Sequence, residues 1–275
     1  MKLKTLLTAM ALGAGALAVV PASAATIKTP DGALSPWGGF DWAQAGTAFT
    51  TGFTGIAGNQ FDMTIFAAAV SLDALGGGPF LGLKLDSSMN GASQGAGWYE
   101  YTLVAKVTEQ ISSCTATDCK FDILSGTFDI YLDTTPDADM RAGKNGTGFL
   151  DGVRMISGVF GAQDGGTFTT SGNGSNSTTV TGNVTYTNLA YINPALVTTT
   201  ATTTLQLGTA QTNWTNPGGF NGTPWAPGSG EIVMQADANQ SFTSAQVPEP
   251  TTLALLGVAL AGMGVASRRK GRAQS

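Results

Sequence analysis

The sequence predicts an all-β protein, in which an antiparallel β-sandwich or jelly-roll-like body is flanked by an N-terminal signal peptide and a C-terminal transmembrane helix. Short stretches rich in Thr, Val, Ile and aromatic residues recur through residues 25–246, separated by Gly-, Asn- and Pro-rich turns. Thr has a branched β-carbon, which favours strands over helices. The same region has no long amphipathic helical pattern. These observations favour packed antiparallel sheets.

Residues 1–24 have the pattern of a secretory signal peptide. Two lysines lie near Met1, residues 6–20 are apolar, and Pro21 ends the apolar run. A small-residue cleavage site follows, formed by Ala22, Ala24 and Ala25. We expect a mature N-terminus at Ala25 and a body that spans residues 25–246. A retained membrane anchor is the alternative, which the small-residue site disfavours.

The first part of the body contains two aromatic residues of possible functional interest, Trp37 and Trp42, in an extended lead-in at 26–46. Their rings either pack on the core or stand exposed. Residues 48–58 and 60–72 have strand-like composition. Three consecutive alanines at 67–69 also permit a short helix there. The Gly-Gly-Gly-Pro sequence at 76–79 ends this region.

The clearest strand pattern covers residues 99–111, where mostly apolar side chains share one face and polar side chains share the other, with Val104 as an exception. A second strand follows at 121–133. Its apolar residues change parity halfway, since Phe121 and Ile123 have the opposite phase to Phe128. We expect a β-bulge near residues 125–126 to reconcile the two phases. The simplest arrangement is a hairpin of these two strands.

Cys114 and Cys119 are the two cysteines of the chain and lie between these strands. In an oxidising compartment they are expected to pair and to hold the hairpin in register. The loop is short, so the chain-entropy contribution is roughly 2 to 3 kcal/mol at most. A zinc site would need more ligands than two thiolates. A redox pair is the remaining alternative, although the spacing is not Cys-x-x-Cys.

An acidic turn follows the second strand. The carboxylates of Asp133, Asp137 and Asp139 are the oxygen ligands that Ca²⁺ prefers, so calcium is the one cofactor that the sequence suggests. The alternative is an ordinary Asp- and Pro-rich turn at a strand end. An EF-hand loop is excluded, because Arg141 occupies a ligand position.

The second half of the body contains short strands at 153–160, 166–170, 178–186, 198–207 and 231–237. A Gly- and Pro-rich loop at 218–230 carries Trp225, and Trp214 precedes it. Together with Trp37 and Trp42, these rings are candidate platforms for sugar rings. They equally suit a role in covering the end of a sandwich.

Ionisable residues exclude several functions. The chain has no His, which excludes Ser-His-Asp and Cys-His catalysis and zinc sites that use His. Seven Lys and Arg against 17 Asp and Glu give residues 25–246 a formal net charge of about −10. Nucleic acid is therefore a poor partner. A glycoside hydrolase would need paired carboxylates, and Glu100, Glu109 and Glu231 lie in no recognisable motif. We expect no enzymatic activity.

The last 29 residues, 247–275, have three parts. Val247, Pro248, Glu249 and Pro250 form an extended, accessible segment, because each proline disfavours helix at its own position and before it. Residues 251–267 are uncharged and, as a helix, roughly 25 Å long, a little short of the hydrocarbon core. A basic cluster that includes Arg268, Arg269 and Lys270 follows and favours a cytoplasmic end. A buried helix of a soluble domain is the disfavoured alternative.

This three-part tail resembles the PEP-CTERM sorting signal of Gram-negative bacteria, in the Val-Pro-Glu-Pro segment, the Leu-Ala-Leu-Leu-Gly run at 253–257 and the Arg-Arg-Lys cluster. The resemblance implies export, a transient membrane anchor and processing by an exosortase in a species that makes exopolysaccharide. Residues 121–133 and the Asn- and Trp-containing second half also resemble flocculation-associated PEP-CTERM proteins.

Two functions follow as expectations. The first is a structural or adhesive protein of the cell surface or matrix, which contacts extracellular polysaccharide and acts in floc or biofilm formation. The second is a carbohydrate-binding module that recognises the same polysaccharide. In both, the membrane is contacted only through the sorting helix before cleavage.

Overall fold

The computed structural model describes residues 24–140, 146–169, 175–206 and 231–245. The body, residues 24–244, forms one compact unit. Its strands are β1 (Ala25–Thr29), β2 (Gly32–Thr51), β3 (Gln60–Ala74), β4 (Glu100–Cys114), β5 (Asp118–Asp133), β6 (Val153–Phe160), β7 (Gln163–Thr169), β8 (Ser175–Thr187), β9 (Ile192–Asn193), β10 (Leu196–Gln206) and β11 (Glu231–Ser244).

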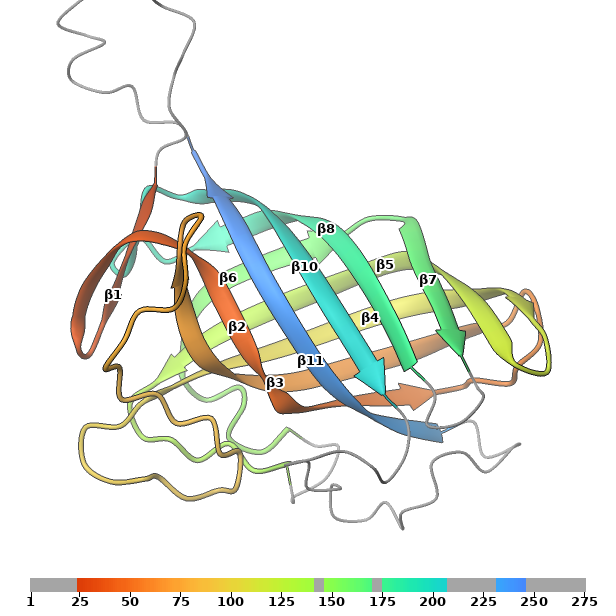
Figure 1. The fold of residues 1–275 in the computed structure, drawn as a ribbon, viewed down its shortest axis with the longest axis horizontal. Helices are drawn as coiled ribbons and strands as arrows, with labels where there is room; N and C mark the ends of the chain where they lie inside the picture. Colours follow the sequence, from red (N-terminus) through yellow and green to blue (C-terminus); the bar gives the residue numbers. More distant parts are fainter. Residues whose placement is uncertain (1–23, 141–145, 170–174, 207–230, 246–275) are drawn as a thin grey trace, which may run out of the picture. The chain divides into compact units, whose positions relative to one another are not determined.

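These strands form one antiparallel sheet that closes on itself. The order is β11-β10-β8-β6-β5-β4-β3-β2-β1-β9, with β7 paired to β5 and β8. β11 pairs along its other edge with β2, from Glu231 opposite Thr51 to Ser241 opposite Gly39. Because this pairing joins both sides of the run, β2, β3, β4, β5, β6, β8, β10 and β11 enclose an interior (Figure 1).

The predicted all-β antiparallel class is confirmed, but the arrangement differs from two packed sheets of a sandwich or jelly roll. The difference lies in β11, which was expected to end at Asp237 and continues to Ser244. That length lets it pair with both β10 and β2. The three alanines at 67–69 form part of β3 rather than a helix, since β2 and β4 pair with it on either side.

Aromatic side chains fill the interior near both ends of β2. Near its start, the ring centroid of Phe40 lies 4.9 Å from that of Trp42 and 5.1 Å from that of Tyr101. Just beyond its end, Phe53 and Phe121 each lie 5.5 Å from Phe61 between ring centroids. Offset and edge-to-face aromatic pairs of this kind stabilise a core beyond the area that they bury.

A second hydrophobic cluster lies on the outward side of β2, β3 and β4. We call it the outer cluster, and its buried members are Ala43, Phe49, Phe66, Ala68, Met89, Val104, Ala138, Met140, Phe149 and Val233. Ala68 and Val104 belong to it, whereas their neighbours along β3 and β4 belong to the interior core. The loops after β3 and β5 therefore give these strands an apolar environment on both faces, which explains the Val104 exception.

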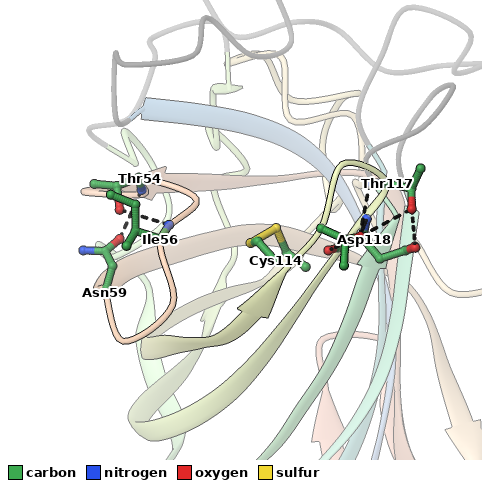
Figure 2. Close-up of a disulfide and its surroundings, with 8 residues drawn as sticks. Thr54, Ile56, Asn59, Cys114, Thr117 and Asp118 are labelled. Carbon is green, nitrogen blue, oxygen red and sulfur yellow. Dashed lines mark hydrogen bonds between the residues drawn. A yellow bond between two sulfur atoms is a disulfide. The ribbon is translucent and has the colours of Figure 1, made fainter.

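The hairpin of β4 and β5 follows the prediction closely. Cys114 pairs with Cys119 in register and the two form a disulfide. At the turn, Thr117 donates its hydroxyl to the Asp118 carboxylate at 2.7 Å (Figure 2). The register shifts between Thr108 and Glu109, which leaves Leu124 unpaired on β5. This bulge lies one residue from the predicted position and places both apolar phases of β5 in the interior.

Candidate functional site

The outward sides of β8, β10 and β11 form a hydroxyl-rich surface. Inward residues of these strands, such as Val180, Ala201 and Leu205, face the interior, so the alternate residues point outward. Figure 1 shows the three strands side by side. We call this surface the hydroxyl face, and it consists of Ser177, Thr179, Thr181, Asn183, Thr198, Thr200, Thr202, Thr204, Asn239, Ser241 and Thr243.

Antiparallel register arranges these side chains in rows across the three strands. Thr200 lies between Thr181 on β8 and Ser241 on β11. In the next row, Thr202 and Thr179 share a hydrogen bond of 3.1 Å between their hydroxyls. Directly opposite pairs of this kind have Cβ atoms about 5 Å apart. The face therefore presents hydroxyl and amide groups at regular spacing, and the carboxylate of Asp237, opposite Thr204, lies at its border.

A hollow of about 440 Å³ lies at one side of the hydroxyl face. Its lining comes from the β6–β7 turn, from β8 and from β10: Gly161, Ala162, Gln163, Thr181, Gly182, Asn183, Thr198, Thr199 and Thr200. The Gln163 amide is fixed in place, because its oxygen accepts the Thr181 N–H at 2.8 Å and its nitrogen donates to the Thr181 carbonyl at 2.9 Å. The hollow has the size of many small-molecule sites and a polar lining.

The tryptophans predicted as sugar platforms do not lie on the hydroxyl face. Trp37 and Trp42 are each 1% exposed, so their rings belong to the interior core and offer no face to a sugar. The Trp37 indole donates to the Gly39 carbonyl at 2.8 Å, and the Trp42 indole donates to the Gln240 amide oxygen at 3.2 Å. The prediction of sugar contact is wrong for both. Trp214 and Trp225 lie outside the described residues.

The predicted calcium ligands are only partly brought together. Within the described ranges, the carboxylates that lie within 4.8 Å of one another are those of Glu100, Asp133 and Asp137. Asp139 lies elsewhere, beside Gly91, because it forms a β-bridge with Asn90. Glu100 is the member that the sequence did not suggest. Calcium binding here stays a prediction.

Glu100 has a structural task in this cluster. It is 1% exposed, and one of its oxygens accepts the backbone N–H groups of Asp137 at 3.0 Å and Ala138 at 3.1 Å. Burial raises its pKa to about 7, although the two N–H groups act in the opposite direction. The carboxyl therefore anchors the loop that covers the outer cluster.

The remaining predicted site residues lie mostly outside the described part of the chain. These are Ala22 of the cleavage site and the sorting-signal residues Val247, Pro248, Glu249, Pro250, Arg268, Arg269 and Lys270. Ala25, the expected mature N-terminus, is the first residue of β1. Within the described ranges, no helix has the length and apolar character needed to cross a membrane.

The hydroxyl face was missed by sequence reasoning, although a signal was present. Thr198, Thr200, Thr202 and Thr204 alternate along one predicted strand, and Thr179 and Thr181 along another. Alternation places such residues on one side of a strand, but it does not identify neighbouring strands. Only the pairing of β8, β10 and β11 brings the rows together.

The comparisons with known proteins concern the C-terminal tail. Residues 246–270 match the family model described as the PEP-CTERM protein-sorting motif. Curated proteins and solved structures gave no match to the chain. The motif confirms the resemblance drawn from the tail and implies a transient C-terminal membrane anchor. The chain thus carries a PEP-CTERM sorting motif, which implies an exported protein processed by an exosortase.

Proposed function

We propose that the processed protein is a structural, adhesive component of the cell surface or matrix of a Gram-negative bacterium, and that it binds neutral extracellular polysaccharide through the hydroxyl face. The role is in floc or biofilm formation. The observation that carries the proposal is the three-strand row arrangement of Thr, Ser and Asn side chains beside a 440 Å³ hollow, in a chain addressed for export.

The chemistry of the face supports a sugar ligand. Hydroxyls both donate and accept hydrogen bonds, and amides supply two donors and an acceptor, which matches the mixed donors and acceptors of sugar hydroxyls. Residues 25–246 have a formal net charge of about −10, which disfavours anionic polysaccharide. A repeating surface also suits a repeating polymer, because several weak contacts along one chain add through effective concentration.

The proposed role is non-catalytic. Glu100 is buried and holds the backbone of 137–138, so it is poorly placed to reach a substrate. Glu109 faces the interior and Glu231 begins β11, on a different strand from both. Glycosidases instead flank an accessible bond with two carboxyl groups.

Polysaccharide binding by the exported protein tests the proposal. The variant Thr181→Val, Thr200→Val and Thr202→Val removes three hydroxyls and keeps the branched side-chain shape. Affinity electrophoresis in dextran, with alginate as the anionic comparison, should show retardation of the wild type in dextran and a loss of about tenfold or more in the variant. Thr127→Val on β5, also exposed, is the matched control and should bind as the wild type does. Equal retardation of the triple variant would argue against the hydroxyl face.

A carbohydrate-binding module is the second candidate, and the hollow beside Gln163 favours it. The two candidates differ in what binding accomplishes. An adhesive protein restores settling when it is added to cells that lack its gene, whereas a module binds polysaccharide without changing aggregation. Settling rates of deleted and complemented cultures therefore separate them.

A further inference from the structure

The interior of the closed sheet contains two cavities that share part of their walls. One of about 70 Å³ is lined mainly by apolar residues of β3, β4, β5, β8, β10 and β11. A second of about 40 Å³ lies toward Phe53, Phe61 and Phe121. Met63, Glu109, Asn176 and Leu205 line both. These cavities have room for a few non-hydrogen atoms in a largely apolar setting.

Glu109 is the anomaly in this setting. It lies on the inward face of β4, two residues after Val107, and is 8% exposed. The structure gives its carboxyl no hydrogen bond or ion pair within the described ranges, and burial, the cause of its pKa shift, raises that pKa to about 7. Among the described residues that line the two cavities, it is the only ionisable group, because Cys119 is in the disulfide. A buried carboxylate without a partner is strongly unfavourable.

A second unpartnered polar group lines the smaller cavity. The Thr50 hydroxyl is buried and has no hydrogen-bond partner. Other polar side chains nearby are satisfied: Gln240 bonds to Trp42 and Thr199, and Asn176 bonds to Gly165 and Thr178. The Glu109 carboxyl and the Thr50 hydroxyl therefore both line the smaller cavity, and each can accept a hydrogen bond there.

We propose that the interior binds a small apolar amine, whose ammonium group donates hydrogen bonds to the Glu109 carboxylate and the Thr50 hydroxyl while its hydrocarbon part fills the larger cavity. The ammonium supplies the opposite charge that the lining lacks. The net negative charge of the body also raises the local concentration of cations. An alcohol offers only one donor and no charge, and a carboxylic acid would place two acids together.

Binding of n-butylamine to the exported, processed protein tests this assignment, with 1-butanol and butyrate as matched probes. At pH 8 the Glu109 carboxylate is ionised, and titration followed by NMR chemical shifts gives each dissociation constant. We expect butylamine to bind at least tenfold more tightly than butanol and butyrate not to bind. Glu109→Gln should weaken amine binding by about 30-fold or more, which corresponds to about 2 kcal/mol for a buried charge that loses its partner.

Two further variants keep the result interpretable. Ala201→Leu fills the larger cavity while leaving Glu109 intact, and it should weaken both amine and alcohol. Asp122→Asn removes an exposed carboxyl from β5 and should change neither. Circular dichroism confirms that each variant is folded. The proposal is overturned if Glu109→Gln or Ala201→Leu leaves amine binding unchanged. It is also overturned if the wild-type protein binds no butylamine and its interior takes up only water.

Discussion

The wall formed by β2, β3 and β4 is buried on both sides where the loops after β3 and β5 cover it, whereas the wall formed by β8, β10 and β11 is buried mainly on its inner side. On the first wall, Phe66 and Val104 point outward into the outer cluster beneath the loops. On the second, Thr200 and Thr202 point outward to solvent. Both walls belong to the same closed sheet and share the same interior.

The difference separates stability from recognition. A wall with apolar side chains on both faces stabilises the fold from both sides, because each Å² of apolar surface removed from water contributes about 25 cal/mol. A wall with exposed hydroxyls buries apolar surface on its inner side alone, and its outer side stays polar and open to a ligand. Substitutions on the outward side should therefore have large effects on stability in the first wall and small effects in the second.

The largest expected effect is that of Phe66→Ala. Phe66 is 4% exposed, and its ring centroid lies 5.2 Å from that of Phe149 and 6.0 Å from that of Phe49. Removing a buried ring of this kind costs about 3–5 kcal/mol through lost transfer energy and the cavity left behind. Urea unfolding followed by tryptophan fluorescence measures the change. A loss below about 1 kcal/mol would show that the outer cluster is not a core.

The next effect concerns the buried carboxyls of β4, which lie on opposite sides of the first wall. Burial raises the pKa of both Glu100 and Glu109 from 4.5 to about 7. A raised carboxyl pKa means that the folded state binds the proton more tightly than the unfolded state does. Proton binding therefore stabilises the folded state fully below pH 4.5, and this stabilisation is lost as the pH rises through 7. Stability of the wild type should therefore decrease between pH 5 and 8.

The variant Glu109→Gln isolates the contribution of the interior carboxyl to this pH dependence of stability. No cationic side chain lines the two cavities among the described residues, so neutralising Glu109 removes a charge that has no compensation. The variant should flatten the pH dependence by on the order of 3 kcal/mol at most. Unfolding free energies at pH 5 and pH 8 give the comparison, with Asp122→Asn as control. An unchanged slope contradicts burial of an ionisable Glu109.

Sequence reasoning predicted much of the fold because local patterns specified it. The β4–β5 hairpin, its disulfide and its bulge follow from alternation, the cysteine spacing and the change of parity in β5. The closure by β11 could not be predicted, because pairing with β2 joins residues about 190 positions apart without a local signal. The burial of Trp37 and Trp42 has the same cause, since their positions inside depend on closure.

The candidate site was less predictable than the fold. Glu100 was expected on the polar face of its strand, and only the loop at 137–138 makes that face buried. Glu109 has the parity of the apolar residues of β4, which was a usable signal for an inward carboxyl. The hydroxyl face depends on neighbouring strands, so single-strand patterns did not reveal it.

The disulfide should have a smaller effect than Phe66. It closes a loop of a few residues between Cys114 and Cys119, and the chain-entropy model gives roughly 2 kcal/mol for such a loop. The variant Cys114→Ser with Cys119→Ser should therefore unfold at lower urea concentration and keep the hairpin register, which the β4–β5 ladder already specifies. Loss of the native circular dichroism spectrum would instead assign the disulfide a role in forming the fold.

The smallest effect is expected for Thr202→Val, the most direct test of the contrast between the walls. Thr202 is exposed and shares a hydroxyl hydrogen bond of 3.1 Å with Thr179 on the next strand. Cross-strand pairs of this kind contribute about 0.2–1 kcal/mol, and Val has a strand preference as strong as that of Thr, so the net change should stay within about 0.5 kcal/mol. The same urea measurement applies, and Thr179→Val with the double variant completes the cycle. A loss of several kcal/mol would mean that the hydroxyl rows hold the sheet together, and the hydroxyl face would then be explained by stability rather than by recognition.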